Sequence, residues 1–485
     1  MDTSRKYLVS LVCIAGVCAL IVLLLALNWS FNPDEFEHVH SAWYIENGYR
    51  PYVDFFQHHH PLLWYVLIPF LAVFGHCTKT MMAVRIFMFV LTLAIAFCTY
   101  LITSRAARCR EAGLLAVAAL LPTVVFARTA VTLRPDVPMV LFGLVSVYFV
   151  ISFLQTGRNR YMAYAGLSAF VSFMFLQKSV FLLIAYAILF LHQLIRKRIS
   201  FKSVMCFCLC FVLPFGAYLA YLALSGAIGD YFLTNWLLNA ARSPSGHGFP
   251  PWGDPELAKG SGLFWLLGGI SLGYVLLRRQ AAGEVKIVAF ITVVLLLSLF
   301  TYNGPWLHYF FFPIVLLSVL IGCCLKAAFD KLKATALFRV ALAVVIIRSP
   351  LEYMIVMCEN QTQHHLQEVD YVLRNSSEDD FVYDGANKFN LYRRDVHYFW
   401  FYLGPGRGLD TYNRLTGDRH GDYDVCDLIR SKKPKFISDY DVDIGGSGLA
   451  ELYRKTRFDG LYMRKAAPVA PAIPATAPAA EEQQQ

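Results

Sequence analysis

The sequence predicts an all-α polytopic membrane bundle of about eleven transmembrane helices, with a small extracytoplasmic α/β segment at its C-terminal end. Two compositional observations support this fold class: 57% of the 485 residues are hydrophobic and only 16% are charged. A soluble globular protein would carry about 25% charged residues. The third observation is that apolar runs of about 17 residues or more recur along the first three-quarters of the chain, each long enough to cross a bilayer as a helix.

The positions of the spans follow from the apolar runs and from the Lys/Arg clusters that separate them. The predicted spans lie near 7–27, 81–103, 112–126, 136–155, 161–177, 179–195, 201–223, 261–277, 285–301, 308–325 and 337–357. This arrangement puts the basic clusters on one side, together with the N-terminus: Arg105 to Arg110, Arg158 to Arg160, Arg196 to Arg198, Arg278 to Arg279 and Lys326 to Lys333. The N-terminus is therefore predicted to be cytoplasmic and the C-terminus extracytoplasmic.

One apolar run, Leu62 to Phe74, is too short to be a span, and counting it would invert every later loop. We predict a helix at the outer interface instead. The chain then divides into a transmembrane domain, 1–357, whose first outer loop is 28–80, and a small extracytoplasmic domain, 358–465. The Ala/Pro-rich tail, 466–485, is predicted to be disordered.

The outer domain is expected to combine a helix near 360–373 with short strands at 380–383 and 435–438. Cys358 and Cys426 both fall in it, and a disulfide between them would suit an oxidising compartment. The basic residues form short clusters without a continuous stripe, so lipids and not nucleic acid are the expected environment.

The first outer loop opens with three carboxylates and two imidazoles: Asp34, Glu35, Glu37, His38 and His40. On a helix that starts after Pro33, the side chains of Asp34, Glu37 and His38 share one face. Such a cluster can abstract a proton or bind a metal. The alternative is that Asp34 only satisfies amide groups at the helix start.

The same loop ends with His58, His59 and His60 before Pro61. Adjacent side chains cannot all face one ion in a helix. Interfacial histidines that bond to lipid head groups or backbone are the plainer interpretation. No metal ligand is assigned from the sequence, and no cofactor is predicted, although a divalent cation remains open.

Further ionisable residues fall at the same predicted face of the membrane. Arg128 and Arg134 precede the fourth span, Asp136 lies at its outer end, and Lys178 interrupts an apolar stretch between two later spans. A helix start would explain Asp136, and snorkelling would explain Lys178. However, separate loops that bring acids and a base to one face indicate a functional site.

These motifs, in this order, resemble the GT-C superfamily, specifically relatives of protein O-mannosyltransferases and of the aminoarabinose transferases that modify lipid A. The resemblance covers about the first 330 residues. The matching elements are Asp34-Glu35, His60-Pro61-Leu62-Leu63-Trp64, Arg128 to Asp136, Leu176 to Ser179, and His308-Tyr309 before Pro313. Two departures are that many relatives carry Lys-Pro-Pro where this chain has His59-His60-Pro61, and that the Lys178 element lacks the family's glycine.

The resemblance implies a polyprenyl-phosphate sugar donor, an acceptor hydroxyl arriving from the aqueous side, and transfer with inversion. It implies Asp34 as general base, with Glu35 and Asp136 as further catalytic acids. The donor phosphate would meet cations: Lys178, Arg128, Arg134, His59 and His60. Glu37, His38, His308 and Tyr309 would line the acceptor pocket. The expected location is a bacterial inner membrane with the site facing the periplasm.

Two other classes stay open on sequence alone. A transporter or flippase of a lipid-linked sugar would carry ionisable residues or helix breaks at mid-span in paired repeats, and the sequence contains no such repeat. A receptor with a sensory outer domain would rest on the C-terminal segment. The sequence does not define the sugar, the acceptor (glycolipid, polysaccharide or protein), the metal dependence or the oligomeric state.

Overall fold

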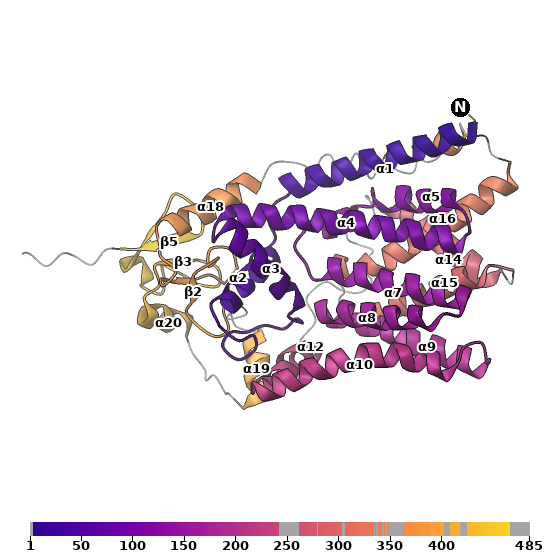
Figure 1. Ribbon diagram of the computed structural model, residues 1–485. Helices are drawn as coiled ribbons and strands as arrows, with labels where there is room; N and C mark the ends of the chain where they lie inside the picture. The colour runs from indigo at the N-terminus through magenta and orange to yellow at the C-terminus, as the bar shows by residue number, and fades with distance from the viewer. Residues whose placement is uncertain are drawn as a thin grey trace, which may run out of the picture.

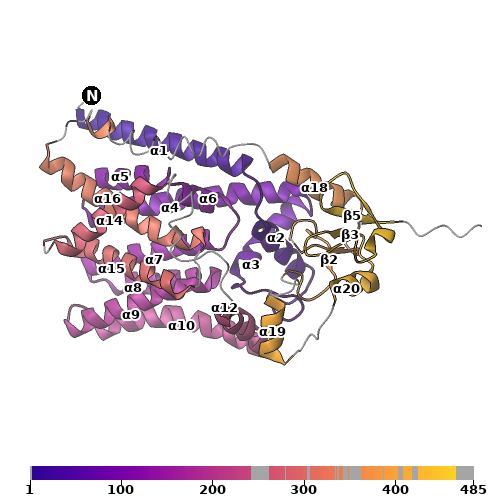
Figure 2. The ribbon, with the colours of Figure 1, turned by 180° about the vertical axis from the view of Figure 1, so that it is seen from behind.

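A bundle of long helices that lie roughly side by side carries a small sheet at one end (Figure 1). The N-terminus lies at the opposite end of the bundle from the sheet in both views (Figures 1 and 2). This computed structural model describes residues 3–241, 261–278, 280–302, 306–333, 335, 338–341, 344, 348, 362–385, 387–401, 408–417 and 424–465. Most of the predicted span 337–357, the tail 466–485 and Cys358 lie outside the described residues.

Seven described helices are long and apolar enough to cross a membrane. They are α1 (Thr3–Asn28), α4 (Thr78–Ala106), α7 (Asp136–Thr156), α9 (Val180–Ile195) with the preceding turn η1 (Gln177–Ser179), α10 (Phe201–Leu224), α15 (Gly283–Ser298) with η4 (Leu299–Thr301), and α16 (Phe311–Lys331) with η5 (Leu307–Phe310). The all-α membrane bundle is confirmed. Within the described residues, the helices that meet this test are fewer than the eleven predicted spans.

The predicted third span, 112–126, is a bent pair, and counting it as one broken span gives eight. α5 (Arg110–Leu120) and α6 (Val124–Val131) meet at 78°. Pro122 lies at this break, and proline has no backbone N–H to continue a helix. α8 (Asn159–Phe175) and α14 (Gly262–Leu277) match two further predicted spans but have only 17 and 16 residues. A count of apolar residues along the sequence does not detect the break between α5 and α6.

The centre of the bundle is formed by α7 and α16, which are the most buried spans, whereas α10 is the most exposed. A Cβ atom at Gly322 of α16 would overlap Ala112 and Ala116 of α5. Small residues let helices approach closely in a membrane, where lipid tails compete for apolar contacts. The close packing of α16 against α5 therefore depends on these three small residues.

The first outer loop contains α2 (Pro33–Glu46) and α3 (Leu62–Phe74), which lie between the bundle and the sheet (Figure 1). Asn32 caps α2: its side chain accepts from the Asp34 amide, and Glu35 reaches back to the Asn32 amide. This capping box and Pro33 in the first turn explain why α2 begins here. α3 has 13 residues, as the sequence predicts, which is too short for a span.

The C-terminal segment is a mixed α/β unit, as expected. Its sheet has the order β2 (Arg394–Asp395), β1 (Phe381–Tyr383), β3 (Phe436–Ser438), β5 (Leu461–Arg464) and β4 (Tyr453–Lys455). Strand β1 is parallel to β2 and β3, and β5 is antiparallel to β3 and β4. The predicted strands correspond to β1 (Phe381–Tyr383) and β3 (Phe436–Ser438), and the predicted helix to α18 (Thr362–Arg374). The other elements are β2 (Arg394–Asp395), β4 (Tyr453–Lys455), β5 (Leu461–Arg464), α19 (Gly408–Thr416), α20 (Val425–Lys432) and η6 (Leu449–Glu451).

Short helices follow α10 on the side of the bundle that faces this unit. They are α11 (Ile228–Phe232), the π-helical turn η2 (Leu233–Leu237) and α12 (Leu238–Ala241). α12 contacts α19 of the C-terminal unit. The first outer loop, these short helices and the sheet therefore surround one end of the bundle (Figure 2).

Candidate active site

Asp34 lies in the first turn of α2, where it meets an arginine from the segment before α7. Its Oδ2 atom is 2.5 Å from Nη2 of Arg134, and the Asp34 side chain is 40% exposed. Nη1 of Arg134 lies 3.3 Å from Nδ1 of His308 in η5. Because Asn32 provides the helix cap, capping does not account for Asp34. Three elements distant in sequence thus place an acid, a cation and an imidazole together.

Arg134 remains a cation at this position. Burial by itself would lower the pKa of Arg134, but Asp34, Asp136 and two nearby glutamates raise it above its ordinary value. A guanidinium only donates hydrogen bonds. Nδ1 of His308 is therefore the acceptor in its contact with Arg134.

A second acid–base pair joins the start of α7 to the turn η1. Oδ1 of Asp136 lies 3.3 Å from Nζ of Lys178, and Asp136 is almost fully buried. The Lys178 ammonium also lies 3.6 Å from the centre of the Tyr309 ring, a cation–π contact. Lys178 is therefore held between an acid and an aromatic face, which snorkelling alone does not explain. Tyr309 follows His308, so η5 connects the two acid–base pairs.

Glu35 points in a different direction, into the protein. Its side chain is fully buried and receives Arg85 of α4 at both oxygens, with Nε at 2.9 Å and Nη2 at 2.7 Å. The Leu133 amide donates to Oε2 at 3.1 Å. Arg85 also donates to three backbone carbonyls at the α1–α2 connection, Ala26, Trp29 and Ser30. This network fixes the backbone next to Arg134.

Arg85 was missed in the sequence analysis, which treated 81–103 as an ordinary span. A usable signal was present, because an arginine inside an apolar segment is rare and normally has a specific partner. The partner itself could not be identified from the sequence, since Glu35 precedes Arg85 by 50 positions.

His60 contacts protein groups at both ring nitrogens. Nδ1 is 2.5 Å from the Phe173 carbonyl oxygen, and Nε2 is 2.9 Å from the Tyr231 hydroxyl. The side chain is fully buried, and burial lowers the pKa of His60 to about 4. A neutral imidazole with both nitrogens engaged has no free position for a phosphate. The structure therefore places His60 as a link between the first loop, α8 and α11.

We expect His60 to make the fold sensitive to acid. Its pKa in the folded chain is lower than the ordinary value of 6.5, so its contribution to stability is complete above pH 6.5 and declines as the pH falls towards about 4. The melting temperature of the purified protein should decrease across that window. A His60→Gln variant should show a flatter profile, whereas His364→Gln, at a side chain that is 66% exposed, should keep the wild-type slope. A His60→Gln profile parallel to the wild type would contradict this role.

Three further predicted residues contact other parts of the protein. Burial lowers the pKa of His38 to about 4, and its Nδ1 accepts from the Trp64 indole at 3.2 Å. Oε1 of Glu37 accepts from Gln57 at 3.1 Å. Arg128 lies over the Trp29 ring, 5.3 Å from its centre, at the contact between α6 and α1. The charges of Asp34 and Arg134 also act on His38, and Glu37 is one of the acids that raise the pKa of Arg134.

Glu37, His58 and His59 could hold a metal ion, because their ligand atoms all lie within 4.8 Å of one another. Two imidazoles and one carboxylate are a donor set that suits zinc. No metal ligand was predicted from the sequence. Glu37 was not recognised as a partner of the two histidines, because the three residues meet only when α2 packs against the end of its own loop.

The C-terminal unit also contacts the first outer loop directly. Oδ2 of Asp395 lies 2.8 Å from Nε2 of His40 and accepts from the Tyr44 hydroxyl at 2.8 Å. His76 bridges Glu46, at 2.8 Å, and Glu378, at 2.7 Å. Sequence reasoning did not anticipate these contacts. They hold α2 between the bundle and the sheet.

Comparison with known proteins supports the glycosyltransferase resemblance that the sequence predicts. Residues 58–218 match the family model described as dolichyl-phosphate-mannose-protein mannosyltransferase. No curated protein matches the chain. Among solved structures, the chain is similar to ArnT from Cupriavidus metallidurans bound to undecaprenyl phosphate, with a TM-score of 0.64, 13% identity, and coverage of 94% of this chain and 97% of that chain.

A second similar structure is the archaeal oligosaccharyltransferase AglB from Archaeoglobus fulgidus, in complex with an inhibitory peptide and a dolichol-phosphate. The TM-score is 0.56 at 11% identity, and the match covers 89% of this chain and 69% of that chain. The bundle, its outer loop and these likenesses define the class as a polytopic membrane protein with the GT-C glycosyltransferase fold. The family model over 58–218 agrees with the predicted resemblance to protein mannosyltransferases, and the likeness to ArnT shows that the fold is shared.

Proposed function

We propose that this chain transfers a sugar from a polyprenyl-phosphate donor to an acceptor hydroxyl on the extracytoplasmic face of a membrane, with inversion. The observation that carries the proposal is the meeting of Asp34, Arg134, Asp136 and Lys178 at the end of the bundle covered by the first outer loop. The carriers named for the ArnT and AglB structures, undecaprenyl phosphate and dolichol-phosphate, support this donor class.

Asp34 is the general base in this mechanism. The acceptor oxygen attacks the anomeric carbon, its proton passes to the Asp34 carboxylate, and the bond between the anomeric carbon and the phosphate oxygen breaks with its electron pair staying on the phosphate. Attack opposite the leaving group inverts the anomeric centre. Asp34 is the most accessible acid of the site, with a side chain that is 40% exposed, so an acceptor from the aqueous side can reach it.

Arg134 couples donor binding to the freeing of that base. It holds Asp34 through Nη2, and a phosphate competes for the same planar donor face, because guanidinium groups bind carboxylates and phosphates in the same geometry. Donor phosphate on Arg134 releases Asp34 to accept a proton. Lys178, held over Tyr309, stabilises the departing phosphate electrostatically.

The other predicted residues take supporting roles. Glu35 is a positioning residue, because its bonds to Arg85 and the Leu133 amide fix the segment that carries Arg134. Asp136 orients Lys178. His308 orients Arg134. Glu37, His58 and His59 would hold a divalent metal, which would supply a fixed positive charge between α2 and the end of the first loop.

The location that we propose is a bacterial inner membrane, with this end of the bundle facing the periplasm. The acceptor is a glycolipid, a polysaccharide or a protein. The sequence clusters Arg105 to Arg110 and Arg196 to Arg198 lie on the opposite side of the bilayer in this orientation, as the excess of basic residues in cytoplasmic loops requires.

A transfer assay with the purified full chain in lipid tests the proposal. Radiolabelled polyprenyl-phosphate sugars would be supplied as a panel, with release of the carrier phosphate measured beside sugar transfer. We expect turnover of at least one carrier sugar and an inverted product. Binding of a carrier sugar without transfer or hydrolysis, together with its movement across sealed vesicles, would instead establish a transporter.

A further inference from the structure

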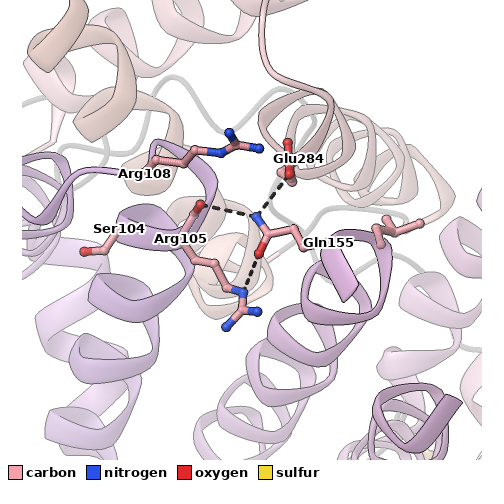
Figure 3. Close-up of a pocket in the computed structure, with 6 residues that line it drawn as sticks. Ser104, Arg105, Arg108, Gln155 and Glu284 are labelled. Carbon is pink, nitrogen blue, oxygen red and sulfur yellow. Dashed lines mark hydrogen bonds between the residues drawn. The ribbon is translucent and has the colours of Figure 1, made fainter. Parts of the chain in front are cut away.

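A polar cavity lies at the other end of the bundle, away from the first outer loop and the sheet. Its volume is about 600 Å³, and its lining comes from the ends of three spans and from the turn after α4: Ser104, Arg105, Arg108, Leu154, Gln155 and Glu284. Figure 3 shows Arg105, Arg108 and Glu284 around the Gln155 amide. The ends of membrane spans lie at the depth of the lipid head groups. A polar ligand at this cavity would therefore be part of a lipid or would arrive from water.

Three of the six lining side chains, Arg105, Gln155 and Glu284, are fixed by hydrogen bonds. Arg105 of α4 donates from Nε to Oε1 of Gln155 at 2.6 Å and from Nη1 to the Tyr148 hydroxyl at 3.1 Å. Nε2 of Gln155 donates to Oε1 of Glu284 at 3.0 Å. A single amide thus connects α4, α7 and the first turn of α15. The positions of one cation and one carboxylate are set before any ligand arrives.

Arg108 is different, because its exposed guanidinium has no hydrogen bond or ion pair within the part of the chain that the structure describes. Its backbone has a φ of 53°, in the turn between α4 and α5. In Figure 3, Arg108 and Glu284 lie on one side of the Gln155 amide, and the Arg105 guanidinium lies on the other. The cavity therefore presents an unpaired cation and a carboxylate on the same side.

We propose that this cavity binds the phosphoethanolamine head group of an aminophospholipid. The phosphate is bound by Arg108, with Arg105 adding positive charge, and the primary ammonium donates to Glu284. A guanidinium is suited to a phosphate, and charge-assisted hydrogen bonds of this kind are among the stronger polar contacts. This inference concerns the far end of the molecule and does not depend on the proposed transferase activity.

The residues of the cavity discriminate between head groups. A phosphatidylglycerol head group offers no cation for Glu284, so the carboxylate would repel its charge. A choline head group has no N–H to donate, and quaternary ammonium groups are typically bound by aromatic cages. None of the six residues that line the cavity is aromatic. A phosphate ester that carries a primary amine satisfies both the cation and the acid.

Native mass spectrometry of the full-length protein in detergent would test this, with phosphatidylethanolamine, phosphatidylcholine and phosphatidylglycerol of identical acyl chains. We expect the wild type to bind phosphatidylethanolamine most tightly. Arg108→Gln should weaken that binding by about tenfold, as the loss of one charge-assisted contact implies. Glu284→Gln keeps an acceptor for Gln155 but loses the charge, so it should abolish the preference over phosphatidylglycerol. Arg196→Gln, at an exposed arginine outside the cavity, is the matched control.

Soluble competitors distinguish a head-group site from a simple phosphate site. Phosphoethanolamine should displace the bound lipid more effectively than inorganic phosphate does, because only the former carries the ammonium. Equal displacement by the two would overturn the assignment of Glu284. Equal binding of the three lipids by the wild type, or an Arg108→Gln variant that binds like the Arg196→Gln control, would overturn the site altogether.

Discussion

The Asp34→Asn variant is expected to lose sugar transfer by about 10²- to 10⁴-fold, the range in which removal of a general base acts, while the protein stays folded. The amide cannot accept the acceptor's proton. Folding should survive, because the helix cap is supplied by Asn32 and Asp34 contributes only its backbone amide to it. The ion pair with Arg134 is partly exposed, and such pairs contribute little to stability. The measurement is turnover of the carrier sugar, beside a thermal melt of the same preparation.

Asp54→Asn is the matched control for this experiment. Asp54 lies on the same outer loop and makes the same kind of ion pair, with Arg50 at 3.1 Å. It should transfer sugar at the wild-type rate. The two variants differ in which arginine loses its partner: Asp34 pairs with Arg134, whereas Asp54 pairs with Arg50. An Asp34→Asn protein that melts normally and keeps full turnover would refute Asp34 as the base.

A large loss of stability is expected for Arg85→Met, on the order of 3–5 kcal/mol, because it leaves the Glu35 carboxylate buried without its partner. Three carbonyls at the α1–α2 connection would also lose a donor. The expected observation is a strongly lowered melting temperature and poor recovery of folded protein. The double variant Arg85→Met/Glu35→Leu should melt above Arg85→Met, because it removes the unpaired charge.

Arg50→Met provides the comparison at an exposed pair. The Arg50 side chain is 52% exposed, so its loss should leave the melting temperature close to that of the wild type. If Arg85→Met melted like Arg50→Met, the buried pair would not be what holds α2 against α4. If the double variant melted no higher than Arg85→Met, the cost would come from the three carbonyls and not from the isolated carboxylate.

Hydropathy alone located most of the helices, because a segment in lipid must satisfy its own backbone hydrogen bonds and must be apolar over its length. The predicted span 136–155 corresponds to α7 at Asp136–Thr156, and 201–223 corresponds to α10 at Phe201–Leu224. The break between α5 and α6 was not predicted, because both halves are equally apolar. Among the described residues, α8 and α14 are also shorter than the other spans, so fewer than eleven helices meet the length and hydropathy test, although the fold class was right.

The sequence by itself determined that this is a polytopic membrane protein with acids and bases collected at one end of its bundle, since bilayer thickness and loop charge constrain topology strongly. Only the tertiary structure decided which side chains meet. Asp34 and Glu35 are neighbours with the same chemistry, yet one meets Arg134 at the surface and the other meets Arg85 in the interior. Successive residues on a helix point in different directions, and the partners come from elements packed around it. Those partners are distant in sequence, so spacing along the chain cannot identify them.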